Sequence, residues 1–118
     1  MYDLSGFNRF TVDDTPARVQ ITPNGIRLID PCNQIPDKPL AVLLNPRGTL
    51  MVLKVDSCGI PQRVVRGRRE LVCAAAIRTM ARRGVKLPQT VPLDWDDECG
   101  GYVAALRNAA TEGMQALI

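Results

Sequence analysis

The chain has 118 residues, a formal net charge of +3, 46% hydrophobic residues, four cysteines and no histidine. This is the length of one domain, and it can bury about two-thirds of the surface of the unfolded chain, so no disulfide or metal is needed for stability. The lack of histidine removes the usual general base of nucleophilic catalysis, and we expect no catalytic site, cofactor or metal. No signal peptide or apolar run of spanning length is recognised, which predicts a cytoplasmic protein with no membrane partner.

We expect residues 1–118 to form a single domain with an extension at each end. Residues 1–16 are interpreted as an N-terminal arm whose Phe7 and Phe10 pack on a sheet. Residues 107–118 are alanine-rich and are interpreted as a C-terminal tail.

Two β-hairpins are predicted over residues 18–29 and 40–55, because both have a loop of the form Pro-x-Gly between aliphatic runs. Proline fits the first central position of a type I turn, and the glycine that follows can take a positive φ. The first hairpin alternates polar and apolar residues, as in a sheet with one solvated face. The second is apolar almost throughout, which predicts a place in the middle of the sheet with both faces covered.

A strongly basic segment follows the hairpins. Residues 62–67 are predicted to form a short edge strand, and residues 69–83 a helix with Gly67 as its N-cap. Glu70 would lie in the first turn of this helix, and Gly84 would end it. The 3.6-residue period places four apolar or small side chains on one helix face: Cys73, Ala76, Ile77 and Met80.

A third hairpin is predicted at the C-terminal end, with strands at residues 90–95 and 100–106 and a turn at residues 96–99. The fold class is therefore α+β: a small, mostly antiparallel sheet of two Pro-x-Gly hairpins plus a C-terminal hairpin, packed against one main helix.

The third hairpin also carries the chain's densest group of carboxylates: Asp94, Asp96, Asp97 and Glu98. Clustered carboxylate oxygens can bind Mg²⁺ or Ca²⁺, but this spacing fits no calcium-binding loop. A solvated turn is the favoured interpretation, and cation binding is left open.

Charge is segregated along the chain, because residues 60–93 hold eight basic residues and one acidic residue, a net charge of +7. Arginine binds phosphate in a bidentate geometry, so this segment is the candidate contact for duplex DNA. Aromatic residues are not interleaved with these arginines, which favours duplex over single strands. The candidate residues are Arg63, Arg66, Arg68, Arg69, Arg78, Arg82, Arg83 and Lys86.

Residues 19–55, with their Asn24-Gly25 turn and proline-bearing connector, resemble the AbrB-like and MraZ-like swapped-hairpin transcription factors. The resemblance implies a homodimer that presents arginines to DNA. The whole layout also resembles short uncharacterised proteins carried on bacterial mobile elements, which implies no particular activity. The leading hypothesis is a non-enzymatic nucleic-acid-binding or regulatory protein. The alternative is a protein–protein adaptor or assembly subunit whose arginines meet an acidic surface, and an enzyme ranks third.

Overall fold

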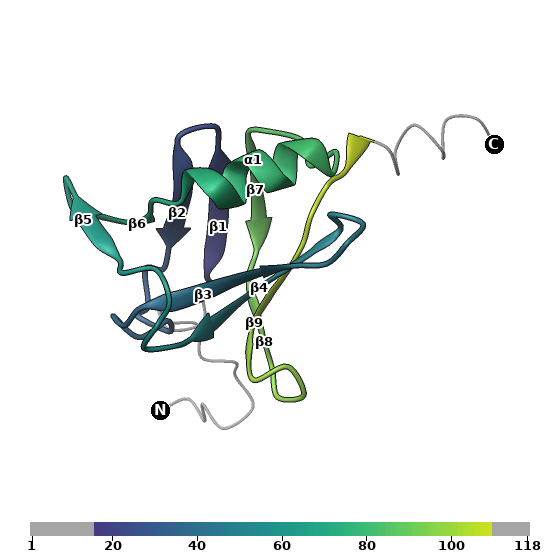
Figure 1. Ribbon diagram of the computed structural model, residues 1–118. Coiled ribbons are helices and arrows are strands. Elements are labelled where there is room, and N and C mark those ends of the chain that lie inside the picture. Colours follow the sequence, from purple (N-terminus) through teal and green to yellow (C-terminus); the bar gives the residue numbers. More distant parts are fainter. Residues whose placement is uncertain (1–15, 110–118) are drawn as a thin grey trace, which may run out of the picture.

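The structure is a computed structural model that describes residues 16–109, and in this part of the chain two antiparallel sheets pack against one helix, an α+β fold (Figure 1). The predicted N-terminal arm up to residue 15 and the tail from residue 110 lie outside the described residues. The helix is α1 (Ala74–Arg82). The strands are β1 (Arg18–Thr22), β2 (Gly25–Ile29), β3 (Leu40–Leu44), β4 (Leu50–Val55), β5 (Arg63–Val65), β6 (Arg68–Leu71), β7 (Gln89–Pro92), β8 (Asp94–Asp96) and β9 (Gly101–Ala105).

The first sheet has the strand order β5-β6-β2-β1-β7. Strands β1 and β2 form the first predicted hairpin, with Thr22 opposite Gly25 across the Pro23-Asn24 turn. Val19 and Ile21 are fully buried while Arg18 is exposed, so the predicted alternation with one solvated face is confirmed. The edge strand predicted within residues 62–67 is also present, as β5.

The second sheet has the order β3-β4-β9-β8, which corrects the prediction of one sheet. The second hairpin does not lie in the middle with both faces covered, because β3 is an edge strand and Leu43 and Leu50 are 48% and 44% exposed. Only one face of this hairpin packs against the first sheet, through Leu40, Met51 and Leu53. An aliphatic run therefore did not require burial on both sides.

The strand predicted at residues 90–95 is divided between the two sheets. Residues 89–92 pair with β1 as β7, whereas residues 94–96 pair with β9 as β8. Proline at position 92 has no N–H to continue a ladder, and the N–H of Leu93 donates to Ala17 O at 2.9 Å. The chain changes sheets at this point.

The helix begins later than the sequence predicts. Residues 68–71 form β6 on the edge of β2, with Leu71 opposite Ile26, and Cys73 is the N-cap of α1. Gly67 therefore lies in the turn between β5 and β6, Glu70 lies in β6, and neither belongs to the helix. Arginine, glutamate and leucine favour helices locally, but the unpaired edge of β2 offers hydrogen bonds that outweigh this preference.

The rest of the helix agrees with the prediction. Ile77 and Met80 are buried, and Gly84 follows the helix with a φ of 86°. The helix lies above β3 and beside the ends of the strands of the first sheet (Figure 1). Its two buried side chains complete the apolar cluster formed by the inner faces of both sheets.

Gly48 ends the Pro-x-Gly loop of the second hairpin with a φ of 69°, and a Cβ there would lie 3.0 Å from Arg83 O and from Asn108 Nδ2. Replacing Gly48 with alanine should lower the free energy of unfolding by more than about 1 kcal/mol in urea denaturation. Gly67 is the matched control, because its φ is 76° but a Cβ there would meet nothing within 4 Å. Equal losses for the two alanine variants would contradict the crowding at Gly48.

Candidate nucleic-acid interface

The solvated face of the first sheet carries a row of polar residues that crosses all five strands. The registers place Arg63 opposite Glu70, Glu70 opposite Arg27, and Arg27 opposite Gln20, which in turn lies opposite Thr90. Side chains two residues apart on a strand share a face, so Arg18 and Arg68 lie on this side too. We call this surface the arginine face; its basic residues are Arg18, Arg27, Arg63 and Arg68, with Arg66 at the tip of the β5–β6 hairpin.

Arg27 lies at the centre of the arginine face with weak hydrogen bonding. Its Nη1 donates to Gln20 Oε1 at 3.3 Å and its Nη2 to Glu70 Oε1 at 3.5 Å, both near the upper limit for a hydrogen bond. Its Nε is buried and has no partner among residues 16–109. The guanidinium is thus under-satisfied, and a strong anionic acceptor within its reach would be favourable.

Two hollows border Arg27. One of about 530 Å³ lies between Arg27, Arg68 and the loop after β2, and one of about 350 Å³ lies between Arg27, Arg66 and Arg68. Glu70 is the one acidic residue on the arginine face as the structure describes it. Each hollow is lined by three arginines and one carboxylate, which is Asp30 in the larger hollow and Glu70 in the smaller one. Both hollows therefore keep a net positive charge, and both are of a size that admits phosphate oxygens.

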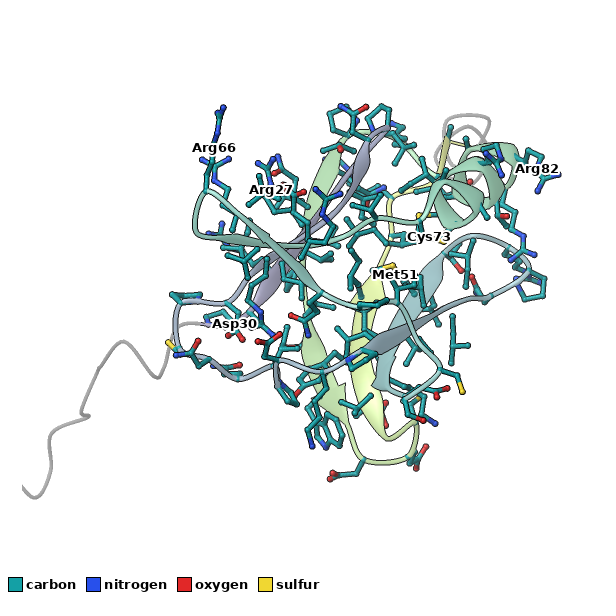
Figure 2. All side chains as sticks on the ribbon, turned by 60° about the vertical axis from the view of Figure 1, so that its left-hand side comes forward. Arg27, Asp30, Met51, Arg66, Cys73 and Arg82 are labelled. Atoms are coloured by element: carbon teal, nitrogen blue, oxygen red, sulfur yellow. The ribbon has the colours of Figure 1, made fainter. Side chains whose placement is uncertain are left out.

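The β5–β6 hairpin presents an arginine at an unfavourable backbone position. Val65 lies opposite Arg68, so Arg66 and Gly67 form a two-residue turn, with φ values of 53° and 76°. Positive φ at both positions defines a type I′ turn, which normally holds asparagine or glycine at the first position. Arg66 instead projects from the tip, away from the body of the protein (Figure 2).

Arg69 belongs to the opposite face of the same hairpin. Its Nη1 pairs with the fully buried Asp30 carboxylate at 3.1 Å, and its Nε donates to Gln62 Oε1 at 2.7 Å. Its Nη2 donates to Ile35 O and Pro36 O at 2.8 and 3.0 Å. The Asp30 carboxylate also accepts hydrogen bonds from two backbone N–H groups of the same loop. This guanidinium connects the loop at residues 30–39 to the first sheet, and few of its donors remain for a ligand.

Tyr102 approaches the same loop from the second sheet, where its hydroxyl donates to Gln34 O at 2.8 Å. Burial, and secondly the negative charge of Asp30, raise the pKa of Tyr102. The phenol therefore keeps its proton as the hydrogen-bond donor.

The remaining candidates lie on or after the helix. Arg78 and Arg82 are exposed on α1, and Arg83 Nη1 donates to Leu44 O and Asn45 O at 3.2 and 3.1 Å. Lys86 follows the helix and is half-buried. Arg66 and Arg82 project at opposite ends of the view in Figure 2. The structure thus separates the basic segment into a hairpin group on the first sheet and a helix group beside β3.

Arg18 and Arg27 are absent from the sequence-based set of site residues because they precede the basic segment. One signal could have found them, since both occupy polar positions of an alternating strand. Such positions face the same side as the polar residues of the neighbouring strands. The charge count along the chain does not contain this information.

The acidic turn makes its own hydrogen bonds. Asp96 Oδ1 accepts the N–H groups of Glu98 and Cys99 at 2.8 and 3.2 Å, and Asp97 Oδ1 accepts Trp95 Nε1 at 2.6 Å. These bonds are those of a self-contained turn. Residues 16–109 contain no group of three or more cysteine or acidic side chains that could hold a metal ion.

All four cysteines are free thiols; Cys58 and Cys99 are exposed, and Cys32 and Cys73 are half-buried.

The structure describes no helix between residues 16 and 109 that is long and apolar enough to cross a membrane.

Comparison of the chain with protein-family models, with curated proteins and with solved structures gives no match.

Proposed function

We propose that the protein is a non-enzymatic, cytoplasmic nucleic-acid-binding protein, with a regulatory role, that contacts the phosphates of duplex DNA through the arginine face. The observation that carries this proposal is the type I′ turn with Arg66 at its tip. A non-glycine residue at positive φ is retained at a cost in stability, which favours a role for its side chain outside the fold.

The shape of the surface supports a duplex. The major groove of B-DNA admits a two-stranded β-ribbon, and the β5–β6 hairpin is such a ribbon at the edge of the first sheet (Figure 1). Arg63 and Arg68 would flank the ribbon while Arg66 reaches furthest from the sheet. Arg27 would bind a phosphate oxygen beside the hairpin, where its guanidinium is under-satisfied.

The aromatic residues that the structure describes do not lie on the arginine face. Trp95 and Tyr102 pack edge to face on β8 and β9, in the second sheet. Proteins that bind single strands stack bases on aromatic rings, and the arginine face between residues 16 and 109 offers none. Backbone contact with a duplex fits this surface better.

The salt dependence of duplex binding tests the proposal. If the three hairpin arginines and Arg27 each neutralise one phosphate, the slope of log K against log salt is about −3.6. Affinity measured by fluorescence anisotropy should then fall about a hundredfold between about 50 and about 200 mM salt. A parent protein that binds no duplex at low salt would refute the proposal.

The triple variant Arg63→Gln, Arg66→Asn and Arg68→Gln should reduce the salt slope by about three and weaken binding to unrelated duplexes equally. Asparagine suits the first position of a type I′ turn, so the hairpin should stay folded. The matched control is Arg47→Gln, Lys54→Gln and Arg107→Gln, which removes the same charge away from the arginine face. Equal losses in both variants would show that only net charge matters and would overturn the assignment of this surface.

A second candidate function, a protein–protein adaptor or assembly subunit, is favoured by one observation. Leu43 and Leu50 are 48% and 44% exposed on the solvated side of the second sheet, next to Val52 and Val103. A homodimer formed through this apolar face would leave the arginine face accessible.

A further inference from the structure

A groove of about 330 Å³ runs between the edge strand β3 and the helix α1. Val42 and Leu44 line it from β3, and Cys73, Ala76, Met80 and Arg83 line it from the helix and its two ends. Small side chains on the helix leave room between the two elements. In Figure 1 the helix lies above β3.

The backbone of β3 offers unpaired hydrogen-bonding groups to this groove. Leu40 exchanges two hydrogen bonds with Ile60, at 3.0 and 2.8 Å, so its N–H and C=O point away from β4. Along an antiparallel strand every second residue points the same way, which places the N–H and C=O groups of Val42 and Leu44 on the open edge. Leu44 O confirms this, because it accepts Arg83 Nη1. Within residues 16–109 the Val42 N–H and C=O and the Leu44 N–H have no hydrogen-bond partner.

The charge beside the groove has one sign. Arg83 lines the groove and closes the Leu44 end of the edge, where its Nη1 donates to Leu44 O at 3.2 Å. No acidic residue lines the groove or lies in α1. An occupant with a negative charge near Arg83 would therefore be complementary.

We propose that this groove binds an extended acidic peptide segment that adds a strand to β3. Strand addition to an open edge supplies backbone hydrogen bonds, and side-chain pockets supply specificity. One peptide side chain enters the groove between Val42 and Met80, and this apolar site requires an apolar residue. The peptide residue two positions further along the strand faces the same side and reaches Arg83, so this residue must be acidic. This inference does not depend on the proposed binding of nucleic acid, which uses the other sheet.

The probe is the capped peptide Thr-Leu-Thr-Glu-Thr, titrated into the ¹⁵N-labelled full-length protein and followed by NMR. We expect concentration-dependent shifts of the Val42 and Leu44 amides. The peptide Thr-Leu-Thr-Lys-Thr should bind about tenfold more weakly, because it places a like charge beside Arg83. Shifts that are absent at both amides, or that are equal for the two peptides, would overturn the proposal.

Two variants make the test specific. Val42→Pro removes the N–H on the open edge, a position where an edge strand tolerates proline, and should abolish the shifts at Leu44. Arg83→Glu should reverse the preference, so that the lysine peptide binds better than the glutamate peptide. This second variant keeps the proposal falsifiable if Val42→Pro does not fold. An unchanged preference in Arg83→Glu would refute the assigned role of Arg83.

Discussion

Replacing Arg69 with methionine is expected to lower the free energy of unfolding by about 3 to 5 kcal/mol. The side chain of Asp30 is 0% exposed, and Arg69 is the cation paired with it, at 3.1 Å. Methionine fills a similar volume but leaves this carboxylate buried without its counter-charge, and Ile35 O loses the hydrogen bond from Arg69 Nη2. The loss is a large share of the total stability of a small domain. Urea denaturation followed by circular dichroism measures it.

Arg63→Met is the matched control for this prediction. Arg63 is exposed on the edge strand β5, so the same change of residue type there should alter stability by no more than about 0.5 kcal/mol. Adding Asp30→Asn to Arg69→Met should recover part of the loss, because the unpaired charge is removed. If Arg69→Met and Arg63→Met unfold at the same urea concentration, the buried ion pair does not stabilise the loop.

Ile77→Asp is expected to unfold the domain, with a loss of about 4 to 5 kcal/mol or more. Ile77 is 7% exposed and lies on the helix face that packs into the apolar cluster. An unpaired carboxylate would enter this cluster with no cation or donor to receive it. Loss of the native circular dichroism spectrum and of the cooperative melting transition would report the unfolding.

Ala74→Asp is the control for the helix. Ala74 is exposed in the first turn of α1, where a negative charge is favourable, so this variant should melt like the parent protein or slightly higher. A native melting curve for Ile77→Asp would mean that the helix packs through a different face.

Features that depend on residues close together in the sequence were predictable. The turns of both Pro-x-Gly hairpins lie where proline and glycine place them, and the helix face of Ile77 and Met80 follows from a period of 3.6 residues. These signals are local because the turn or helix satisfies its own backbone. They carry no information about which strands become neighbours in space.

The division into two sheets and the strand at residues 68–71 were not predictable for this reason. The residues from Arg68 to Leu71 become a strand only because the edge of β2 is available, and β2 is distant in sequence. The partner of Arg69 is likewise Asp30, so the burial of one candidate arginine is set by a long-range contact. The composition of the basic segment gives its net charge, but it does not show which of its arginines lie on the first sheet and which lie on the helix.

The order of strands in the first sheet has a consequence for synthesis of the chain. One edge of β1 (residues 18–22) pairs with β7 (residues 89–92), a strand that is synthesised much later. A ribosome adds about 5 to 20 residues per second, so β1 and β2 wait several seconds for the strand that closes their open edge. Their hairpin itself can form within about 10 μs of emerging. During this interval the nascent chain exposes both an unpaired edge and the aliphatic faces of two hairpins, and this is the stage at which a chaperone would protect it best.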